Sequence, residues 1–586
     1  MPSYCRVALD SPVSALDRPF DYAIPDRLAG RIHIGSVVRV VLHGRSMRAF
    51  VTELLDVPAV PDPRPLRAVV ATDPVFAPSE IELARWTARR YVVPLGHVLH
   101  DAVPGRFSAP GSGGERVESP GRRRGPAELG KAIRDRRAVC VIPPTDREEP
   151  DLAAFVAGEG GPTLIICPRV GQAELVAAGI PGALVLHGED RPSERAAAWA
   201  AARDGRASVV VGGRSALFAP LPELSAVCVL SAHDRSLKSE RAPRIYAPAV
   251  AAKRAEMCGA AFVASSPAPP VEIAAEHAAW IDAGKGSVRT EIARPRGGPV
   301  TARLIEVVRS AVESGSDALV FVGRKGEALR LRCANCGWRP SCERCNAGLA
   351  QGATRGELEC RVCGLSASAP VTCRSCGGAL VERGWGHERV AREIERAGLG
   401  VEVVAVARGM VPELRKEPTV VVGTLAAAHI ARDFGSVCVA DLDELLARPD
   451  FRAGERVLQT LHDLAGVLRS GGRFLVQTRE PEHHAVQAFT RRSYRYFFER
   501  EMRFREETGY PPFGVVVRVE TPTESLAGLS AGLEPLDAHV VGAVERRGLS
   551  RALVRAPSLE PLLEPLRAFS AAHARTKIDV DPVDVI

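Results

Sequence analysis

The sequence predicts a multidomain α/β protein, with a β-rich N-terminal domain, two lobes built on parallel sheets and a small α+β C-terminal domain. Three observations lead to this prediction. At 586 residues, 46% of them hydrophobic, the chain can bury several separate cores. Two regions alternate short β-branched runs with helical segments, as parallel sheets do. Many of the 14 cysteines gather in one short segment, which predicts a separate module there.

Residues 1–105 form the first predicted domain. The stretch GSVVRVVLHGRSMRAFVTEL contains two β-rich runs joined at His43-Gly44, which predicts a hairpin within a small twisted sheet or barrel. A helix follows, and Ser79 and Glu82 are its predicted capping box. The N-terminus lacks a signal peptide's basic-then-apolar order, and no run approaches the roughly 20 apolar residues of a membrane span. We therefore expect a cytoplasmic protein without membrane contact.

Residues 106–127 are rich in Gly, Ser and Pro and show no periodic pattern, so a flexible linker is expected. The linker carries three consecutive arginines, Arg122, Arg123 and Arg124. They either contact phosphate groups or form a solvated run of charge. The net charge of +7 permits a nucleic-acid partner but is too small to establish one.

Residues 128–290 contain six short strands, AVCVI, TLIIC, ALVLH, SVVVGG, AVCVL and AAFVAS, separated by helical segments. A second set, DALVFVG, VEVVAV, TVVVGT, SVCVAD and RFLVQT, occupies residues 291–330 and 381–490. Two such RecA-like lobes in tandem are the architecture of superfamily 2 helicases, where ATP would bind between them. Residues 331–380 interrupt the second set after its first strand, and residues 491–586 form the predicted C-terminal domain.

The segment 331–380 contains four C-x-x-C pairs. Each pair forms a tight turn that directs two thiolates at one ion, and two pairs complete a tetrahedral Zn²⁺ site. Eight thiolates thus predict two structural zinc ions, rather than disulfides, which a reducing cytosol would not maintain. The eight are Cys333, Cys336, Cys342, Cys345, Cys360, Cys363, Cys373 and Cys376.

The loop after the first strand of the 128–290 region, PPTDREEP, lies where a nucleotide-binding lobe has its phosphate loop. A phosphate loop needs backbone N–H groups, glycines and a lysine. Here the prolines offer no N–H, while Asp146, Glu148 and Glu149 would repel phosphate and the one cation is Arg147. The sequence predicts that the fold persists without this phosphate-binding chemistry.

Several stretches resemble the primosomal protein N′ (PriA) family, through nearly the whole chain. They are RPFDY (18–22), LVLHGEDRPSERAAAW (184–199), VVVGGRSALFAPLPEL (209–224), the spaced cysteines, DLDELLARPDFRAGERVLQ (441–459) and TGYPPFG (508–514). The resemblance implies a superfamily 2 helicase fold that recognises abandoned replication forks and starts reloading of the replicative helicase. It also implies a DNA-binding role for the β-rich domain.

The resemblance implies particular site residues. The family's zinc pairing is interleaved, so Cys333, Cys336, Cys373 and Cys376 would bind one ion, and Cys342, Cys345, Cys360 and Cys363 the other. Phe20, Asp21, Gly35 and, by looser alignment, Arg67 correspond to the family's pocket for a DNA 3′ end. A carboxylate can accept a hydrogen bond from a 3′-hydroxyl, and an aromatic ring can stack on a base. The alternative for Phe20 and Asp21 is a core aromatic beside a turn-capping acid.

The family's ATPase motifs are not matched. Its G-x-x-x-x-G-K-T is PPTDREEP here, and its D-E-E-H is LSAH, residues 230–233, which retains only His233. Its AGRAGR, the source of an arginine finger, is AGVLRSGG, and its GT-QMLAKG motif is GTLAAAHIARD. Phosphoryl transfer depends almost entirely on electrostatic positioning, so these losses predict no catalytic residues and leave ATP doubtful. The family's winged-helix domain is also missing, because the linker is too short for it.

Three functions remain open from the sequence. The first is a noncatalytic replication restart protein that binds forked DNA, single-stranded DNA-binding protein and primosome or helicase-loading proteins. The second is a working ATP-dependent 3′ to 5′ helicase with unorthodox nucleotide contacts. The third is a zinc-ribbon adaptor for RNA or transcription complexes without fork specificity. Whether the protein is an enzyme at all therefore depends on the fate of the nucleotide site.

Overall fold

The structure is a computed structural model. It describes residues 2–71, 73–103, 105, 120–121, 123–277, 279–284, 288–295, 298–323, 330–333, 335–336, 338–343, 348–352, 354, 356–360, 365–383, 386–406, 417–428, 430, 433–448, 450–573 and 575–585. The predicted features that lie wholly or partly outside these residues are most of the linker 106–127 with its Arg122, Cys345, Cys363 and part of the GTLAAAHIARD segment.

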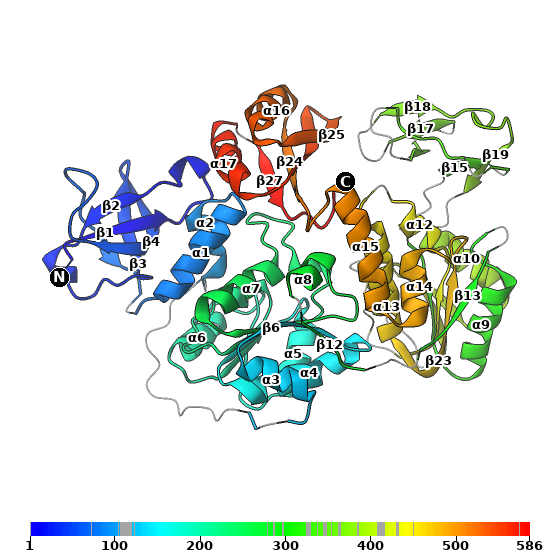
Figure 1. The fold of residues 1–586 in the computed structure, drawn as a ribbon, viewed down its shortest axis with the longest axis horizontal. Helices are drawn as coiled ribbons and strands as arrows, with labels where there is room; N and C mark the ends of the chain where they lie inside the picture. The colour runs from blue at the N-terminus through cyan, green and yellow to red at the C-terminus, as the bar shows by residue number, and fades with distance from the viewer. Residues whose placement is uncertain are drawn as a thin grey trace.

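The first domain is a small barrel, at the left of Figure 1. Its strands, in the order β2-β1-β4-β3-β5, are β1 (Tyr4–Leu9), β2 (Phe20–Ala23), β3 (Val37–Leu42), β4 (Arg45–Leu55) and β5 (Ala68–Val69). The segment before β5 returns to β2, where the Leu66 N–H donates to the Ala23 carbonyl at 3.0 Å, so the sheet closes on itself. His43 and Gly44 both have positive φ, as a tight hairpin turn between β3 and β4 requires, and the predicted hairpin is confirmed.

Helices α1 (Pro78–Arg90) and α2 (Leu95–Ala102) join the barrel to the first lobe. The predicted capping box is wrong: α1 begins at Pro78, and Glu80 accepts the Ala77 N–H at 2.9 Å. Proline favours the first helical position, because its missing N–H would be unpaired there anyway. The buried ion pair Arg254–Glu80 ties α1 to helix α7 of the first lobe.

Lobe 1 is a seven-stranded parallel sheet with helices on both faces (Figure 1). The strand order is β12-β6-β11-β10-β7-β9-β8. Its strands are β6 (Ala138–Ile142), β7 (Thr163–Ile166), β8 (Leu184–Leu186), β9 (Val209–Gly212), β10 (Ala226–Val229), β11 (Ala261–Ser265) and β12 (Trp280–Asp282). Its helices are α3 (Ala127–Arg134), α4 (Glu149–Gly160), α5 (Val170–Ala178), α6 (Pro192–Arg203), α7 (Ala247–Cys258) and α8 (Val271–Glu276).

Lobe 2 is a six-stranded parallel sheet in the order β13-β23-β22-β14-β21-β20. Its strands are β13 (Arg289–Ala293), β14 (Ala318–Phe321), β20 (Glu402–Val406), β21 (Thr419–Gly423), β22 (Phe434–Val439) and β23 (Leu468–Gln477). Its helices are α9 (Ala302–Glu313), α10 (His387–Arg396), α11 (Leu425–Ala428), α12 (Asp443–Leu446), α13 (Ala453–Gly466), α14 (His484–Arg491) and α15 (Tyr494–Thr508). In both lobes the strands are strongly apolar and are buried under helices, as the sequence pattern predicts.

The cysteine-rich module stands beyond lobe 2, at the upper right of Figure 1. Its short strands are β15 (Arg330–Cys333), β16 (Ala350–Gln351), β17 (Glu357–Glu359), β18 (Ser366–Ser368) and β19 (Leu380–Arg383). The C-terminal domain is an antiparallel sheet in the order β25-β26-β24-β27, with two helices. It comprises β24 (Val515–Pro522), α16 (Leu526–Leu533), β25 (His539–Arg546), β26 (Leu549–Ala556), α17 (Leu563–Ala572) and β27 (Lys577–Val580). The predicted fold class is confirmed.

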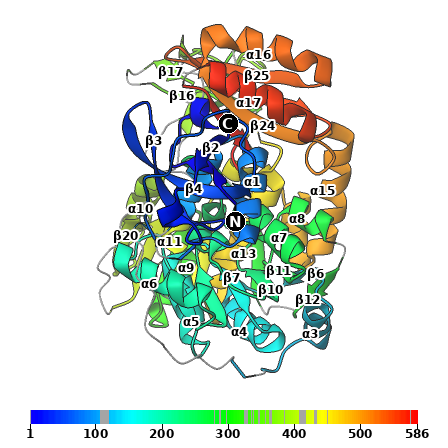
Figure 2. The same ribbon diagram turned by 90° about the vertical axis from the view of Figure 1, so that its left-hand side faces the viewer.

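The end of the chain contacts three other parts of the molecule. The ion pairs of residues 577–584 are Asp579–Lys238 with lobe 1, Asp581–Arg90 with α1, and Asp584–Arg456 with lobe 2. Figure 2 shows the C-terminal helices above the barrel. The domain limits given above remain a proposal. Some elements straddle them, since residue 290 falls inside β13 and residue 490 inside α14, and α15 packs with the core of lobe 2.

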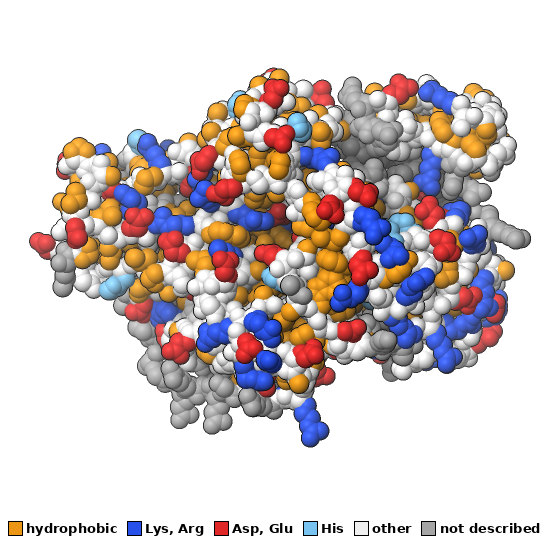
Figure 3. All heavy atoms as spheres, in the orientation of Figure 1, with side chains coloured by type: hydrophobic (Ala, Val, Ile, Leu, Met, Phe, Trp, Pro, Cys, Tyr) orange, Lys and Arg blue, Asp and Glu red, His pale blue; other side chains and the backbone are white. Residues whose placement is uncertain are grey.

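None of the described helices is both long and apolar enough to cross a membrane. On the face shown in Figure 3, basic and acidic side chains are interspersed rather than segregated. This agrees with the small net charge of the chain.

Candidate functional site

Glu149 lies where the family resemblance would place the phosphate-loop lysine. It begins α4, directly after the loop that follows β6, and its carboxyl group is buried inside lobe 1. The Ser231 N–H donates to Oε1 at 2.8 Å, the Ser231 hydroxyl to Oε2 at 2.6 Å and the Ser265 hydroxyl to Oε1 at 2.9 Å. Gln172 donates to Oε2 at 3.0 Å. These hydrogen-bond donors, which could otherwise bind a phosphate, thus bind the carboxyl group of Glu149 instead.

The electrostatics of this position oppose a phosphate. Burial, together with the negative charge of Asp146, raises the pKa of Glu149 to about 8 against the hydrogen bonds from Ser231 and Ser265. Burial also raises the pKa of Asp146 to about 6. Two buried carboxyl groups therefore lie where the resemblance implies a phosphate loop, which would need a lysine and glycine N–H groups to bind ATP.

His233 connects lobe 1 directly to lobe 2. Its Nε2 lies 2.7 Å from Oδ1 of Asp463, which is on α13, and 4.0 Å from Oδ2 of Asp146. Burial alone would lower the pKa of His233, but the carboxylates of Asp463 and Asp146 raise it to about 10. Asp234, the next residue, turns away and pairs with Arg169 at 2.8 Å. The retained histidine thus makes an ion pair across the cleft between the lobes.

Arg147, the cation of the loop, also reaches lobe 2. Its Nη2 donates to Asp433 at 2.6 Å and its Nε to the Gly466 carbonyl at 2.5 Å. Gly466 belongs to AGVLRSGG, the segment that the resemblance aligns with the family's arginine-finger motif. The guanidinium is therefore occupied by lobe 2 contacts rather than directed at a phosphate position.

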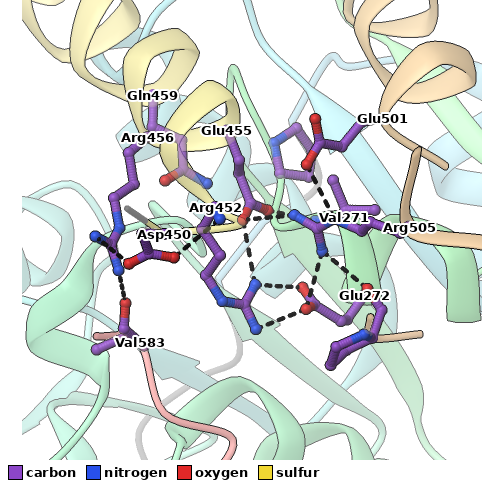
Figure 4. Close-up of polar contacts among 12 residues, drawn as sticks. Val271, Glu272, Asp450, Arg452, Glu455, Arg456, Gln459, Glu501, Arg505 and Val583 are labelled. Atoms are coloured by element: carbon purple, nitrogen blue, oxygen red, sulfur yellow. Dashed lines mark hydrogen bonds and ion pairs between the residues drawn. The ribbon is translucent and has the colours of Figure 1, made fainter. Parts of the chain in front are cut away.

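A larger ion-pair network joins α8 of lobe 1 to α13 and α15 of lobe 2 (Figure 4). Glu272 binds Arg452 at 2.6 Å and Arg505 at 3.0 Å. Arg505 also binds Glu455 at 3.1 Å and Glu501 at 3.0 Å. Burial raises the pKa of Glu272, but Arg452 and Arg505 lower it to about 2. Because each guanidinium and carboxylate is paired, the network favours a closed arrangement of the two lobes.

A cavity of about 360 Å³ remains beside the loop. Its lining includes Pro143 and Pro144 of the loop and three exposed arginines, Arg491, Arg492 and Arg495. Exposed cations attract anions only weakly, because water screens them, and the two prolines have no N–H to donate. The cavity offers space for a small molecule without the phosphate-binding geometry of an ATPase.

The residues of the 3′-end pocket are distributed over the barrel. Phe20 is half-buried against the barrel core, and Arg18 lies over its ring at 5.1 Å from the centroid. Asp21 follows on β2, with a side chain only 2% exposed. Its carboxylate accepts hydrogen bonds from Arg6 and from the Ala59 N–H, at 2.7 Å for the latter. A DNA hydroxyl would therefore have to approach a carboxylate that already has partners.

Gly35 and Arg67 lie on other segments of the barrel. Gly35 is in line with Phe20 across the sheet, because Phe20 pairs with Val7, Val7 with Val51, and the Gly35 N–H donates to Val51. A Cβ at Gly35 would lie 1.8 Å from the Phe76 carbonyl oxygen, so this glycine permits a close backbone approach. Arg67 is exposed and follows Leu66, whose N–H closes the barrel against β2. The assignment of a 3′-end pocket stays a prediction.

The outer cysteines form a cluster. The sulfur atoms of Cys333, Cys336, Cys373 and Cys376 all lie within 4.8 Å of one another. The separations Cys333–Cys376 and Cys336–Cys373 are 3.4 and 3.6 Å. Tetrahedral zinc with bonds of about 2.3 Å places its sulfur ligands about 3.8 Å apart. The donor set and its spacing thus fit one zinc ion, with the interleaved pairing.

For the inner cysteines the structure describes only half of the set. Cys342 and Cys360 are buried, and they pack with Leu349 and Leu358 in a small apolar cluster. The Cys360 N–H donates to the Leu365 carbonyl at 2.8 Å. Cys345 and Cys363 lie outside the described residues, so the second zinc site stays a prediction.

Comparison with known proteins decides the family. Residues 6–104 match the model of the PriA 3′ DNA-binding domain. Replication restart protein PriA of Treponema pallidum is 27% identical over an alignment of 671 residues that covers all of both chains. Probable replication restart protein PriA of Mycobacterium bovis is 31% identical over 576 residues, 88% of this chain and 86% of that protein. The chain belongs to the PriA replication restart protein family.

Among solved structures, Mycobacterium smegmatis helicase Lhr bound to ssDNA and AMP-PNP is 14% identical, with a TM-score of 0.32, covering 62% of this chain and 47% of that one. The four outer cysteines that the sequence singled out lie together in the structure. Sequence reasoning missed Asp463, because α13 carries no motif that points to His233 230 residues away.

Proposed function

We propose that this PriA-family protein recognises abandoned or stalled replication forks without unwinding DNA itself. In this proposal it binds branched DNA and the 3′ end of the leading strand, and it promotes primosome assembly and reloading of the replicative helicase. Its protein partners would be single-stranded DNA-binding protein and primosome or helicase-loading proteins, by family resemblance. The place of action would be the cytoplasm, where the clustered thiols stay reduced.

The observation that carries the noncatalytic part is the burial of Glu149 at the lysine position, with its carboxyl group bound by Ser231 and Ser265. ATP hydrolysis needs a cation on the β- and γ-phosphates and carboxylates on Mg²⁺. The carboxyl group of Glu149 supplies no such cation, and Ser231 stands in the box that would supply the carboxylates. The ion pair His233–Asp463 joins the lobes in the place where nucleotide would bind between them.

The DNA-binding part is supported by what the chain retains. Residues 6–104 match a 3′ DNA-binding domain, and the module with the outer cysteine cluster is preserved beyond lobe 2. Neither feature requires nucleotide hydrolysis. A scaffold with two closed lobes can present both to a fork, because its interlobe ion pairs do not require ATP.

The test is fork binding and DNA-stimulated ATP hydrolysis, measured on the same protein preparation with and without ATP. We expect the fork affinity to be the same within about twofold with and without ATP, which corresponds to a difference in binding free energy of about 0.4 kcal/mol. The rate of ATP hydrolysis should equal the buffer background. Reproducible fork unwinding by protein free of contaminating helicase would instead support the active helicase. Nucleotide that binds in the cavity beside the loop but is not hydrolysed would leave the noncatalytic function standing.

Competition distinguishes the zinc-ribbon adaptor. A restart protein prefers a fork with a 3′-hydroxyl end over plain duplex and RNA of equal length. An adaptor without fork specificity would bind these three competitors equally, or prefer RNA. Several salt concentrations are needed, because contacts to phosphate alone weaken steeply as salt rises.

A further inference from the structure

Three metal-ligand side chains meet between the lobes. Asp146 and His233 come from lobe 1 and Asp463 from α13 of lobe 2, and their ligand atoms all lie within 4.8 Å of one another. One imidazole nitrogen with two carboxylate oxygens is a donor set suited to Zn²⁺, Mn²⁺ or Fe²⁺. These residues are distinct from the cysteine cluster and from the lost magnesium ligands of the D-E-E-H position.

The second nitrogen of His233 has a fixed partner. Its Nδ1 lies 2.7 Å from the Ser266 hydroxyl oxygen, which also accepts the Ala268 N–H at 3.1 Å. A metal-bound histidine almost always donates its other ring N–H to an oxygen, and this fixes the ring orientation. Ser266 gives His233 such a partner, and it leaves Nε2 directed at the two carboxylates.

One carboxylate oxygen in the cluster lacks a partner. Oδ1 of Asp146 is buried and makes no hydrogen bond within the part of the chain that the structure describes. The negative charge of Asp146 also acts on the buried Glu149 nearby. A buried charge is normally paired or coordinates a metal, so a cation would satisfy Asp146 and reduce the repulsion between these carboxyl groups.

We propose that Asp146, His233 and Asp463 bind one divalent transition-metal ion that joins the two lobes. Bonds of about 2.0–2.2 Å separate neighbouring ligand atoms by about 3.0–3.5 Å. The distances from Nε2 of His233, 2.7 Å to Asp463 and 4.0 Å to Asp146, lie on either side of that range. Shifts of less than about 1 Å in the two aspartates would complete the site. It does not depend on the proposed DNA function, because it needs only these ligands.

Mn²⁺ is the suitable probe, because it prefers oxygen and nitrogen ligands and leaves zinc on thiolates. The full-length protein, with its cysteine-bound zinc in place, is titrated with MnCl₂ alone, and free Mn²⁺ is followed by electron paramagnetic resonance. We expect one bound Mn²⁺ per chain at micromolar concentrations, with a rise in the melting temperature as the ion fills, because it binds the folded state.

Two isosteric variants test the ligands. Asp463→Asn and Asp146→Asn should each weaken Mn²⁺ binding at least tenfold, while circular dichroism shows that they remain folded. Asp433→Asn is the matched control. Asp433 is exposed and pairs with Arg147, which follows Asp146 in the loop, but it is not part of the Asp146–His233–Asp463 cluster. This variant should therefore bind Mn²⁺ like the wild type.

Two results would overturn the proposal. One is that wild-type protein binds Mn²⁺ only at millimolar concentrations, with no change in melting temperature. The other is that both aspartate variants bind as tightly as the wild type. In either case His233 and Asp463 form a plain ion pair across the lobes. Loss of zinc from the cysteine cluster during the titration is checked by metal analysis, so that a thiolate site is not counted.

Discussion

Arg6 on β1 binds Asp21 on β2 through two hydrogen bonds, from Nε to Oδ1 at 2.9 Å and from Nη2 to Oδ2 at 3.2 Å. The two residues are direct partners in the antiparallel pairing. Burial raises the pKa of Asp21, but the hydrogen bonds from Arg6 and from the Ala59 N–H lower it by more, so the pKa lies below its usual value. The carboxylate is therefore ionised at neutral pH and able to repel a terminal phosphate.

Replacing Asp21 with alanine should abolish the preference for a fork that ends in a 3′-hydroxyl over one that ends in a 3′-phosphate. A hydrogen bond to a charged group contributes about 1.5–3 kcal/mol, so hydroxyl-ended forks should bind about tenfold more weakly or worse. Plain duplex should bind almost as before. Fluorescence anisotropy over both ends and several salt concentrations measures this, and the wild-type preference should persist as salt rises.

Two further variants separate end recognition from damage to the barrel. Arg6→Gln removes the ion pair but keeps the carboxylate, so the end preference should survive it. Asp26→Asn changes an exposed acid of the same domain and should have no effect. If wild-type protein shows no end preference, or Asp21→Ala retains it, then Phe20 and Asp21 are core residues of the barrel.

Removing Cys333 should release one zinc ion per chain. Three thiolates leave an incomplete tetrahedron, so the module should unfold locally while the separately packed lobes remain folded. Metal analysis of freshly purified, reduced protein should give two zinc ions for the wild type and one for Cys333→Ser. Cys258→Ser, at the end of α7 in lobe 1, is the control and should keep both. Fewer than two zinc ions in the wild type would contradict the second site.

Glu149→Lys should not restore ATP hydrolysis. It places a lysine in the loop, but on the proposed function the metal carboxylates and the arginine finger would still be absent, and such groups act as a unit. The new ammonium would be buried among the hydrogen-bond donors of Ser231 and Ser265, so we expect a loss of about 2–4 kcal/mol in unfolding free energy.

Urea denaturation and a sensitive phosphate-release assay measure the two effects of this substitution. Asp151→Lys reverses the same charge at an exposed position of the same helix and should cost about 0.3–1 kcal/mol. Measurable hydrolysis by Glu149→Lys would show that the remaining catalytic groups are present after all.

The interlobe network should weaken in acid. Arg452 and Arg505 depress the folded-state pKa of Glu272 to about 2, despite its burial. A carboxyl group whose pKa is lower in the folded state than in the unfolded state stabilises the fold at pH values above its unfolded pKa, which is 4.5 for Glu272. This contribution to the free energy of unfolding is lost as the pH falls toward the folded pKa of about 2. The contribution is on the order of 3 kcal/mol at neutral pH.

Denaturation of wild type and Glu272→Gln at pH 7, 4 and 3 provides the measurement. The stability difference between the two proteins should shrink steadily as the pH falls. Glu276→Gln, an exposed acid on the same helix, should differ little from wild type at any of these pH values. A Glu272→Gln difference that does not change with pH would mean that the carboxylate charge plays no part.

The sequence predicted what depends on local pattern. The strands of both lobes and the hairpin at His43-Gly44 follow from alternation, β-branched runs and turn residues. The acidic character of the loop that contains Glu149 is read directly from the sequence, while its correspondence to a phosphate loop stays a prediction. One local feature was wrong, because Pro78 fixes the start of α1 ahead of Ser79.

Contacts across the lobes could not be predicted in this way. His233 and Asp463 are 230 residues apart, and Glu272 and Arg505 are 233 apart. Neither pair leaves a spacing pattern, because only the packing of two separate sheets brings them together. The partners of Glu149 could not be predicted either, because they come from the ends of two other strands of the lobe 1 sheet.

Residues 577–584, which pair with α1, lobe 1 and lobe 2, are translated after everything they touch. At about 5–20 residues per second, a ribosome needs roughly half a minute to two minutes to reach them. During that time the barrel and the lobes can pack, but the three acids that join the C-terminal domain to them are not yet made. These three contacts therefore form only after the parts that they join, and a nascent chain stalled before residue 577 would lack them.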